Sequence, residues 1–507
     1  QGSRRAAADF KGFDIGTKER VQIRQPNAKS VFLGRVTSGQ ITEIHGQLDA
    51  NGRVLLVNPA GVVVGPTGTV NTAAFTATTL HADPEQFMQG GTVELKALPG
   101  ADPNAAVINQ GRINTADGGF AALIAPHVVN DGVINARLGQ VQMASGTAAT
   151  LDVSGDGLIQ VVLDPAVAGS ISNSGSIQAS HVRLGGGDAA ALTAATVNLG
   201  GVIEARSAAE VLGLPASERA SIEVRTAGAI TLSGRVDASA RTAGFSGGSV
   251  KLLGQSITLN PGAVVEASGP AGGGEVLVGG NYLGQGPEPN AQQVTIAPGA
   301  AIRADATQAG DGGRVIVWSD ERTEFHGEIS AKGGPEGGDG GFVETSSKQT
   351  LVVTGTVSTA APKGKAGQWL LDPEDVTIVE DSAEAEAEAE TETETEAEAD
   401  SDAAEEDTSS EDESTSEDTT AEAESTDSTE TSDSADSAES DDEEEEEDEE
   451  TTTAEAETSS EETESTAESS ESSISSSSIE QARAEGTEVT VVSSGEVSGA
   501  ESEEATA

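Results

Sequence analysis

The chain has 507 residues, no cysteine, a formal net charge of −59, and only 2% aromatic residues beside 61 glycines. So few large side chains exclude an ordinary globular core of this size and favour a thin aliphatic core built in many small layers. Without cysteine no disulfide can form, which is compatible with export by a route that needs an unfolded chain.

The negative charge is concentrated in the last quarter of the chain. Residues 380–507 contain 51 of the 86 acidic residues and one basic residue, Arg483, which leaves residues 1–379 with 35 acids, 26 bases and a net charge of −9. Neither part offers a basic face for nucleic acid. No apolar run approaches the ~20 residues needed to cross a bilayer.

The first strand signals follow a polar stretch without periodicity. We expect residues 1–12 to be a disordered or truncated leader, and short β-type runs to begin at Phe13. Residues 81–105 carry the loop dipeptides Asp-Pro and Pro-Gly. We therefore predict an excursion there, with Thr92–Leu95 as a short hairpin strand.

The most informative stretch is Val54–Gly65, in which two apolar runs flank Asn58-Pro59-Ala60-Gly61. Unbroken runs of Val and Leu are typical of strands buried on both sides. Asn at the first position, Pro at the second and Gly at the fourth predict a tight type I turn, because Pro pre-sets φ and Asn can bond its own backbone.

A repeat appears from residue 107 onwards. Asn109-Gln-Gly111-Arg-Ile113 recurs as Asn130-Asp-Gly132-Val-Ile134 and again as Asn173-Ser-Gly175-Ser-Ile177. A period of roughly 20–30 residues that carries strands and no helix signal indicates a solenoid. We predict an all-β fold, a parallel β-helix with inward aliphatic ladders, and Gly and Asn at corners that need φ > 0.

The pattern stops and then returns near the C-terminus. Residues 380–473 are almost purely Glu, Asp, Ser, Thr and Ala, and are predicted to be a disordered acidic tract because they cannot bury enough surface to offset chain entropy. Residues 474–507 regain a short β-helix-like pattern, with a helical turn from Ser478 and a strand at Thr487–Val492. The tract is thus expected to interrupt the solenoid.

Several short blocks match a known family in order, among them Phe13-Asp-Ile-Gly16, Gln25-Pro26, Asn51-Gly52 and Asn58–Gly61. They resemble the secretion domain of two-partner-secreted exoproteins, the filamentous haemagglutinin family, over residues 13–165. Residues 166–379 look like the adhesin shaft of that family. The resemblance implies a right-handed parallel β-helix, a dedicated outer-membrane transporter as partner, and a location outside a Gram-negative cell or on its outer-membrane surface.

The family's Asn-Pro-Asn-Gly motif falls on Asn58, Pro59, Ala60 and Gly61, with Ala60 in place of the second Asn. Asn58, Pro59 and Gly61 are therefore the candidate residues for secretion-partner recognition, or simply for building a turn. The family's N-terminal cap and Asn-Pro-Asn-Leu motif have no counterpart before Phe13, which predicts a truncated N-terminus.

The leading functional hypothesis is a haemagglutinin-like adhesin with an unidentified protein or glycan receptor. The alternatives are the delivery stalk of a toxin or contact-dependent inhibition exoprotein, and a β-helical polysaccharide-active enzyme. We expect no catalytic residues, cofactor or metal, because the five His residues lie far apart and no phosphate-loop or nucleophile-elbow motif occurs.

Overall fold

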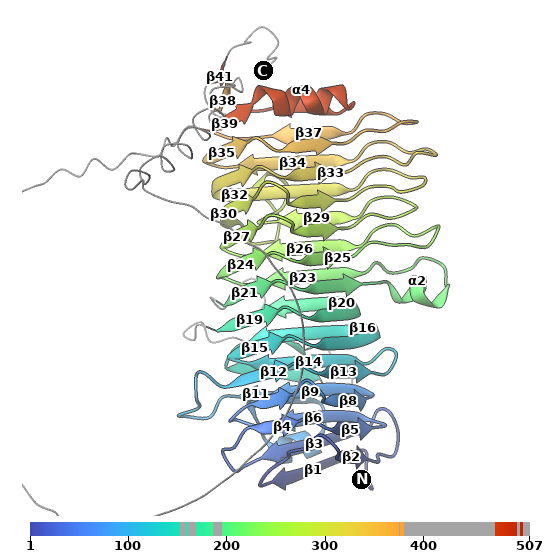
Figure 1. Ribbon diagram of the computed structural model, residues 1–507, viewed down its shortest axis with the longest axis vertical. Helices are drawn as coiled ribbons and strands as arrows, with labels where there is room; N and C mark the ends of the chain where they lie inside the picture. The colour runs from blue at the N-terminus through green and yellow to red at the C-terminus, as the bar shows by residue number, and fades with distance from the viewer. Residues whose placement is uncertain are drawn as a thin grey trace, which may run out of the picture. The chain divides into compact units, whose positions relative to one another are not determined.

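The computed structural model describes residues 1–152, 159–160, 169–185, 195–374, 376–379, 472–493 and 497–499. Its strands form one parallel sheet system of 37 strands and a separate sheet of four. Successive coils lie on one another from β1 and β2 at one end to α4 at the other (Figure 1). The predicted acidic tract, residues 380–473, lies outside the described residues apart from its last two.

Most coils contribute one strand to each of three ladders. The first ladder contains, in stacking order, β1 (Arg5–Phe10), β3 (Val31–Val36), β6 (Arg53–Val57), β9 (Ala74–Thr78), β14 (Phe120–Ala125), the second half of β16 (Val133–Ser145), the second half of β20 (Ser176–Gly185), β23 (Ser221–Arg225), β26 (Ser249–Leu253), β29 (Glu275–Val278), the first half of β32 (Arg314–Phe325), β34 (Phe342–Ser347), β37 (Gln368–Leu371) and β40 (Glu488–Val491).

The second ladder contains β4 (Thr42–Ile44), β7 (Val62–Val64), β12 (Ala106–Asn109), β15 (His127–Asn130), β19 (Ser170–Asn173), β21 (Thr196–Leu199), β24 (Ala229–Leu232), β27 (Ser256–Leu259), β30 (Ala291–Ile296), the second half of β32, β35 (Thr350–Val353), β39 (Ser473–Ser475), β38 (Val376–Val379) and β41 (Val497–Gly499).

The third ladder contains β2 (Arg20–Ile23), β5 (Gln47–Ala50), β8 (Thr69–Thr72), β13 (Arg112–Thr115), the first halves of β16 and β20, β22 (Val202–Ala205), β25 (Arg235–Asp237), β28 (Val264–Glu266), β31 (Ala301–Arg303), β33 (Glu328–Ser330) and β36 (Thr356–Ser358). All pairings in the three ladders are parallel, so the predicted parallel β-helix is confirmed.

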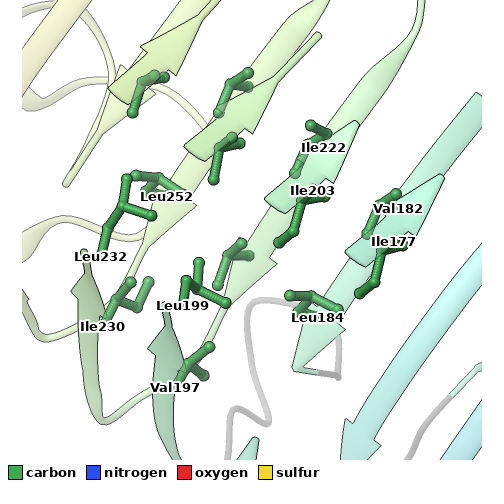
Figure 2. Packing of buried hydrophobic residues seen from close by; sticks show 14 of the residues in the cluster. Ile177, Val182, Leu184, Val197, Leu199, Ile203, Ile222, Ile230, Leu232 and Leu252 are labelled. Atoms are coloured by element: carbon green, nitrogen blue, oxygen red, sulfur yellow. The ribbon is translucent and has the colours of Figure 1, made fainter. Parts of the chain in front are cut away.

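Aliphatic side chains from the three ladders fill the space that they enclose. Figure 2 shows Ile177 and Ile203 from the third ladder facing Val197 and Ile230 from the second. Residues at these inward positions are almost fully buried and belong to one cluster that continues from coil to coil. The thin layered core predicted from the composition is therefore what the chain builds.

The Asn-Gly-Ile repeat lies at the corner between the second and third ladders. Asn109, Asn130 and Asn173 are in register and fully buried, and their side-chain amides bond one another from Nδ2 to Oδ1 at 2.7 Å in both steps. The glycine is needed for a different reason from the one predicted. A Cβ on Gly132 would lie 2.2 Å from the carbonyl oxygen of Gly111, and neither glycine has a positive φ.

The predicted excursion at residues 81–105 is confirmed in its essentials. β10 (His81–Ala82), α1 (Pro84–Gln89) and β11 (Thr92–Lys96) leave the stack, and β11 pairs antiparallel with β17 (Ala148–Asp152), which pairs with β18 (Ile159–Gln160). This small sheet covers the outer face of the first ladder and encloses a second apolar cluster that includes Leu55 and Val57. Val54 and Leu56 face the inner core. The run is therefore buried on both sides, as predicted.

Disorder, one of the two alternatives expected for residues 1–12, does not hold for Arg5–Phe10, which forms β1. Its residues pair with Val31–Val36 in parallel, and Arg35 Nε donates to Asp9 at 2.7 Å. Arg5 donates to the carbonyl of Phe87 at 2.7 Å. Because β1 is rich in alanine, its sequence gives little hydrophobic signal. It forms a strand because the neighbouring strand and the excursion supply its partners.

The prediction that the acidic tract interrupts the solenoid is also confirmed. β38 pairs with β39 through Thr377 and Ser473, and β40 pairs with β37 along its whole length. Between β39 and β40, α4 (Ser476–Ala484) packs against β36. The two remaining helices of the described chain are short and lie in loops, α2 (Ala208–Leu212) and the 3-10 helix η1 (Tyr282–Gly284).

Candidate secretion-recognition site

The Asn58–Gly61 turn connects β6 of the first ladder to β7 of the second. The Gly61 amide donates to the Asn58 carbonyl at 3.0 Å, and the Ala60 amide donates to Asn58 Oδ1 at 3.0 Å. Gly61 has φ +126°, and a Cβ there would lie 3.0 Å from the carbonyl oxygen of Ala106. The sequence prediction of a tight turn that needs Asn and Gly is thus confirmed.

The Asn58 side chain is fully buried and joins neighbouring coils. Its Nδ2 donates to the Gln40 carbonyl at 2.8 Å and to Thr42 Oγ1 at 2.9 Å, both in the preceding coil. Its backbone amide donates to Thr78 in the following coil at 3.0 Å. These hydrogen bonds all lie within the fold, so Asn58 builds the turn, and a role of this residue in partner recognition stays a prediction.

The outer surface of the turn is made by other residues. Pro59 and Ala60 are half-buried and Gly61 is buried, whereas the neighbouring Ile41 is 51% exposed. A Cβ on Gly61 would lie 3.7 Å from Ile41 Cγ1, so the Ile41 side chain borders the turn. Of the three candidate residues only Pro59 reaches the surface. The sequence prediction did not single out Ile41 as an exposed neighbour of the turn, although an apolar residue just before Thr42 was a signal for it.

Three acidic residues form a column on the third ladder, where Glu204, Asp237 and Glu266 are in register. Each is held by arginine. Arg241 lies 3.0 Å from Glu204 and 3.6 Å from Asp237, and Arg235 lies 3.1 Å from Asp237 and 3.7 Å from Glu266.

Hydrogen bonds and burial set the ionisation of this column. Despite desolvation, hydrogen bonds from Ser239 and Arg235 lower the pKa of Asp237, whereas desolvation raises the pKa of Glu266. Paired in this way, the carboxylates resemble a structural ion-pair network more than an acid and a base facing a substrate.

Two of the five histidines bond serines in the next coil. His127 Nδ1 lies 2.8 Å from Ser170 Oγ and His181 Nδ1 lies 2.8 Å from Ser221 Oγ. Burial lowers the pKa of His181. Among the described residues no group of three His, Cys, Asp or Glu side chains is placed to hold a metal ion. These two histidines therefore act as links between coils.

Comparison with known proteins identifies the N-terminal part of this stack. Residues 1–232 match the family described as TPS secretion domain. Residues 1–232 carry a secretion domain of the two-partner-secretion type. The matched residues run as far as β24 and so extend beyond residues 13–165, where the resemblance was seen in the sequence.

A solved structure supports the same assignment for the fold. The HMW1 secretion domain from Haemophilus influenzae aligns with a TM-score of 0.60 and 28% sequence identity, covering 73% of this chain and 94% of that one. The alignment thus reaches beyond the matched secretion domain into the coils that follow.

Two curated relatives from Haemophilus influenzae are both named Heme/hemopexin-binding protein. One is 35% identical over 181 residues, which are 35% of this chain and 20% of that protein. The other is 46% identical over 79 residues, 16% of this chain and 8% of that protein. The chain thus spans a fifth or less of the curated relatives it matches. No helix in the described part of the chain is long and apolar enough to cross a membrane.

Proposed function

We propose that this chain is exported through a dedicated outer-membrane transporter, reaches the outside unfolded, and acts there as a β-helical adhesin. The observation that supports export is the match of residues 1–232 to the TPS secretion domain. The stack supports it physically, because each coil contacts only its neighbours and can form as soon as it emerges. The absence of cysteine removes one obstacle to passage as an unfolded chain.

The adhesive role is proposed for the coils beyond the secretion domain. The same three ladders continue from β25 to β36, and the first ladder continues to β40, without another fold intervening in the described residues, so these coils extend the surface that the secretion domain begins. The receptor, a protein or a glycan, would bind outward side chains and loops. The relatives' name gives heme and hemopexin as ligands of those proteins, and the short shared segment does not by itself carry that ligand here.

We propose action by binding and not by catalysis. The support is the column of Glu204, Asp237 and Glu266, whose carboxylates are all engaged by arginines. A glycosidase needs two carboxyl groups facing each other across the substrate with separate ionisation roles. A polysaccharide-active enzyme would therefore need a different site.

Export can be tested by expressing the native full-length reading frame in a Gram-negative host with and without its transporter. We expect the protein in the medium or on the cell surface only when the transporter is present, and loss of export when residues 1–232 are deleted. Adhesion is then measured as binding of the exported protein to host cells and to immobilised glycans. Transporter-independent export would contradict the first step, and exported protein that binds neither cells nor glycans would favour the delivery-stalk alternative.

The contribution of the turn can be separated into folding and recognition. Asn58→Ala removes buried hydrogen bonds, whereas Pro59→Ser with Ile41→Ser changes the outer surface beside the turn and removes no hydrogen bond. If the transporter reads this surface, the double variant should be retained in the cell although the purified protein unfolds at the normal temperature. Normal export of the double variant would remove the turn surface from the recognition role.

A further inference from the structure

A loop of twelve residues, Gly279–Asn290, crosses the outer face of the first ladder between β29 and β30. We call it the strap. Beneath it lie Leu277, Ile316 and Trp318, three outward side chains that are nevertheless buried and form a cluster separate from the inner core. The contact is close, because a Cβ on Gly284 would lie 2.4 Å from the Trp318 ring.

One acidic side chain is buried beneath the strap. Glu344 on β34 is 0% exposed and stands in register beside Ile316 of β32. Its Oε1 and Oε2 accept the backbone amide of Leu283, in the strap, at 3.1 and 3.3 Å. Leu283 itself has φ +54°, a left-handed conformation that is unfavourable for a branched side chain.

The environment of Glu344 opposes its ionisation. Burial raises the pKa of Glu344 to about 7, opposed in part by the Leu283 amide and Ser346 hydroxyl. Of the charged groups that face it, Asp372 raises this pKa and Arg314 lowers it. Burial also raises the pKa of Asp372 itself.

Glu288, a second acidic residue that holds the strap, differs from Glu344 in its pKa. Glu288 lies 2.7 Å from Lys251 and accepts from Asn281 at 2.9 Å, and these contacts lower its pKa despite desolvation. At the other end, Asn290 donates to Asp320 at 3.0 Å, and Asp320 also accepts from the Trp318 indole at 3.2 Å. These hydrogen bonds hold the two ends of the strap, and between them lies the Glu344 carboxyl group, whose ionisation burial opposes.

We propose that the strap is a pH-dependent cover, which closes over Leu277, Ile316 and Trp318 in acid and loosens towards neutral pH, exposing that apolar surface. The sign follows from linkage: a closed state that binds the Glu344 proton more tightly than the open state is favoured when protons are abundant. Closure is strongest below about pH 4.5, where both states are protonated, and weakens as the pH rises through about 7, above which both states are ionised. Over that interval the opening equilibrium should rise roughly 100-fold or more.

Amide hydrogen exchange of the full chain tests the proposal. Exchange of residues 279–290, divided by the rate of an unstructured peptide at the same pH, should accelerate between about pH 4.5 and about pH 8, while the core strands β29 and β34 remain protected. In Glu344→Gln, a neutral side chain that can still accept the Leu283 amide, this acceleration should be lost and the strap should stay protected throughout. Glu328→Gln, an exposed carboxyl on β33, is the matched control and should behave like the unaltered protein.

Tryptophan fluorescence gives an independent readout, because the chain has only two tryptophans. Trp369 lies in the inner core and serves as the protected reference, so acrylamide should quench only the Trp318 component, and more strongly at neutral than at acidic pH. Strap exchange that does not change with pH in the unaltered protein, or a pH dependence that survives Glu344→Gln, would overturn the proposal.

Discussion

At the scale of single residues, the stack depends on glycines at the corners, where the backbones of neighbouring coils come close together. Gly200 and Gly201 are adjacent but differ completely in surroundings. A Cβ on Gly201 would lie 2.1 Å from the carbonyl oxygen of Gly175 in the neighbouring coil, whereas a Cβ on Gly200 would meet nothing within 4 Å. Glycine at the second position is therefore required by the contact between coils and not by the local turn.

We predict that Gly201→Ala destabilises the stack by about 1–3 kcal/mol, because the clash is with backbone that cannot rotate away. Gly200→Ala should be neutral or slightly stabilising, since alanine restricts the unfolded chain. The two free energies of unfolding can be compared by chemical denaturation. Equal effects would show that the corner is looser than its geometry implies.

Asn58 is a second residue whose buried contacts give a prediction. Asn58→Ala leaves the Gln40 carbonyl, Thr42 hydroxyl and Ala60 amide without their side-chain partner. We expect a loss of about 1–3 kcal/mol, the usual cost of an unsatisfied buried polar group. Ala60→Asn, at a half-buried position that makes no such side-chain contact, should leave the unfolding midpoint nearly unchanged in the same measurement.

At the scale of elements, the most informative arrangement is the return of the chain after the acidic tract. Residues 382–469 contain 41 acidic residues and no Lys or Arg. Yet the strands before and after them, β38 and β39, pair side by side. In the same region Trp369 of β37 is fully buried, and its indole donates to the Thr345 hydroxyl at 2.8 Å. The coils on either side thus form one continuous stack.

Replacing residues 382–469 with a short Gly-Ser linker should therefore leave the stack intact. The ends that the linker must join already belong to paired strands, and a shorter loop has a smaller closure entropy. We expect an unchanged β-type circular dichroism spectrum per ordered residue and an unfolding temperature equal to or slightly above that of the parent. A lower temperature, or loss of protection in β37 and β40, would show that the acidic residues support the fold.

At the scale of the whole stack, contacts run only between neighbouring coils. Ile230 lies in an inward column between Val197 and Ile257, which Figure 2 shows in part. Solenoids of this kind respond to damage locally, since their stability is close to a sum of nearest-neighbour terms.

Ile230→Ala should cost about 2–5 kcal/mol and weaken amide protection mainly in β21, β24 and β27. Protection in β3, β6 and β9, many coils away, should change far less. Hydrogen exchange measured peptide by peptide can map this decay. Equal loss of protection along all coils would indicate global cooperativity instead.

Much of this architecture was predictable because it repeats. The Asn-Gly-Ile motif at residues 109–113, 130–134 and 173–177 indicated coils in register, and the Val54–Val57 run indicated a strand buried on both sides. Those features depend on short-range patterns, which each coil contains in full. The turn at Asn58–Gly61 was predictable for the same reason.

What the sequence by itself determined is the β-helix, its aliphatic core and the interruption by acidic residues, since periodicity and composition act locally. Only the tertiary structure decided that Ala-rich Arg5–Phe10 is a strand, that Ala148–Asp152 pairs with Thr92–Lys96, that Asn58 is fully buried, and that Glu344 is buried beneath the strap. Each of these depends on a partner distant in sequence. Burial and hydrogen bonding at such positions are set by neighbours that no local pattern identifies.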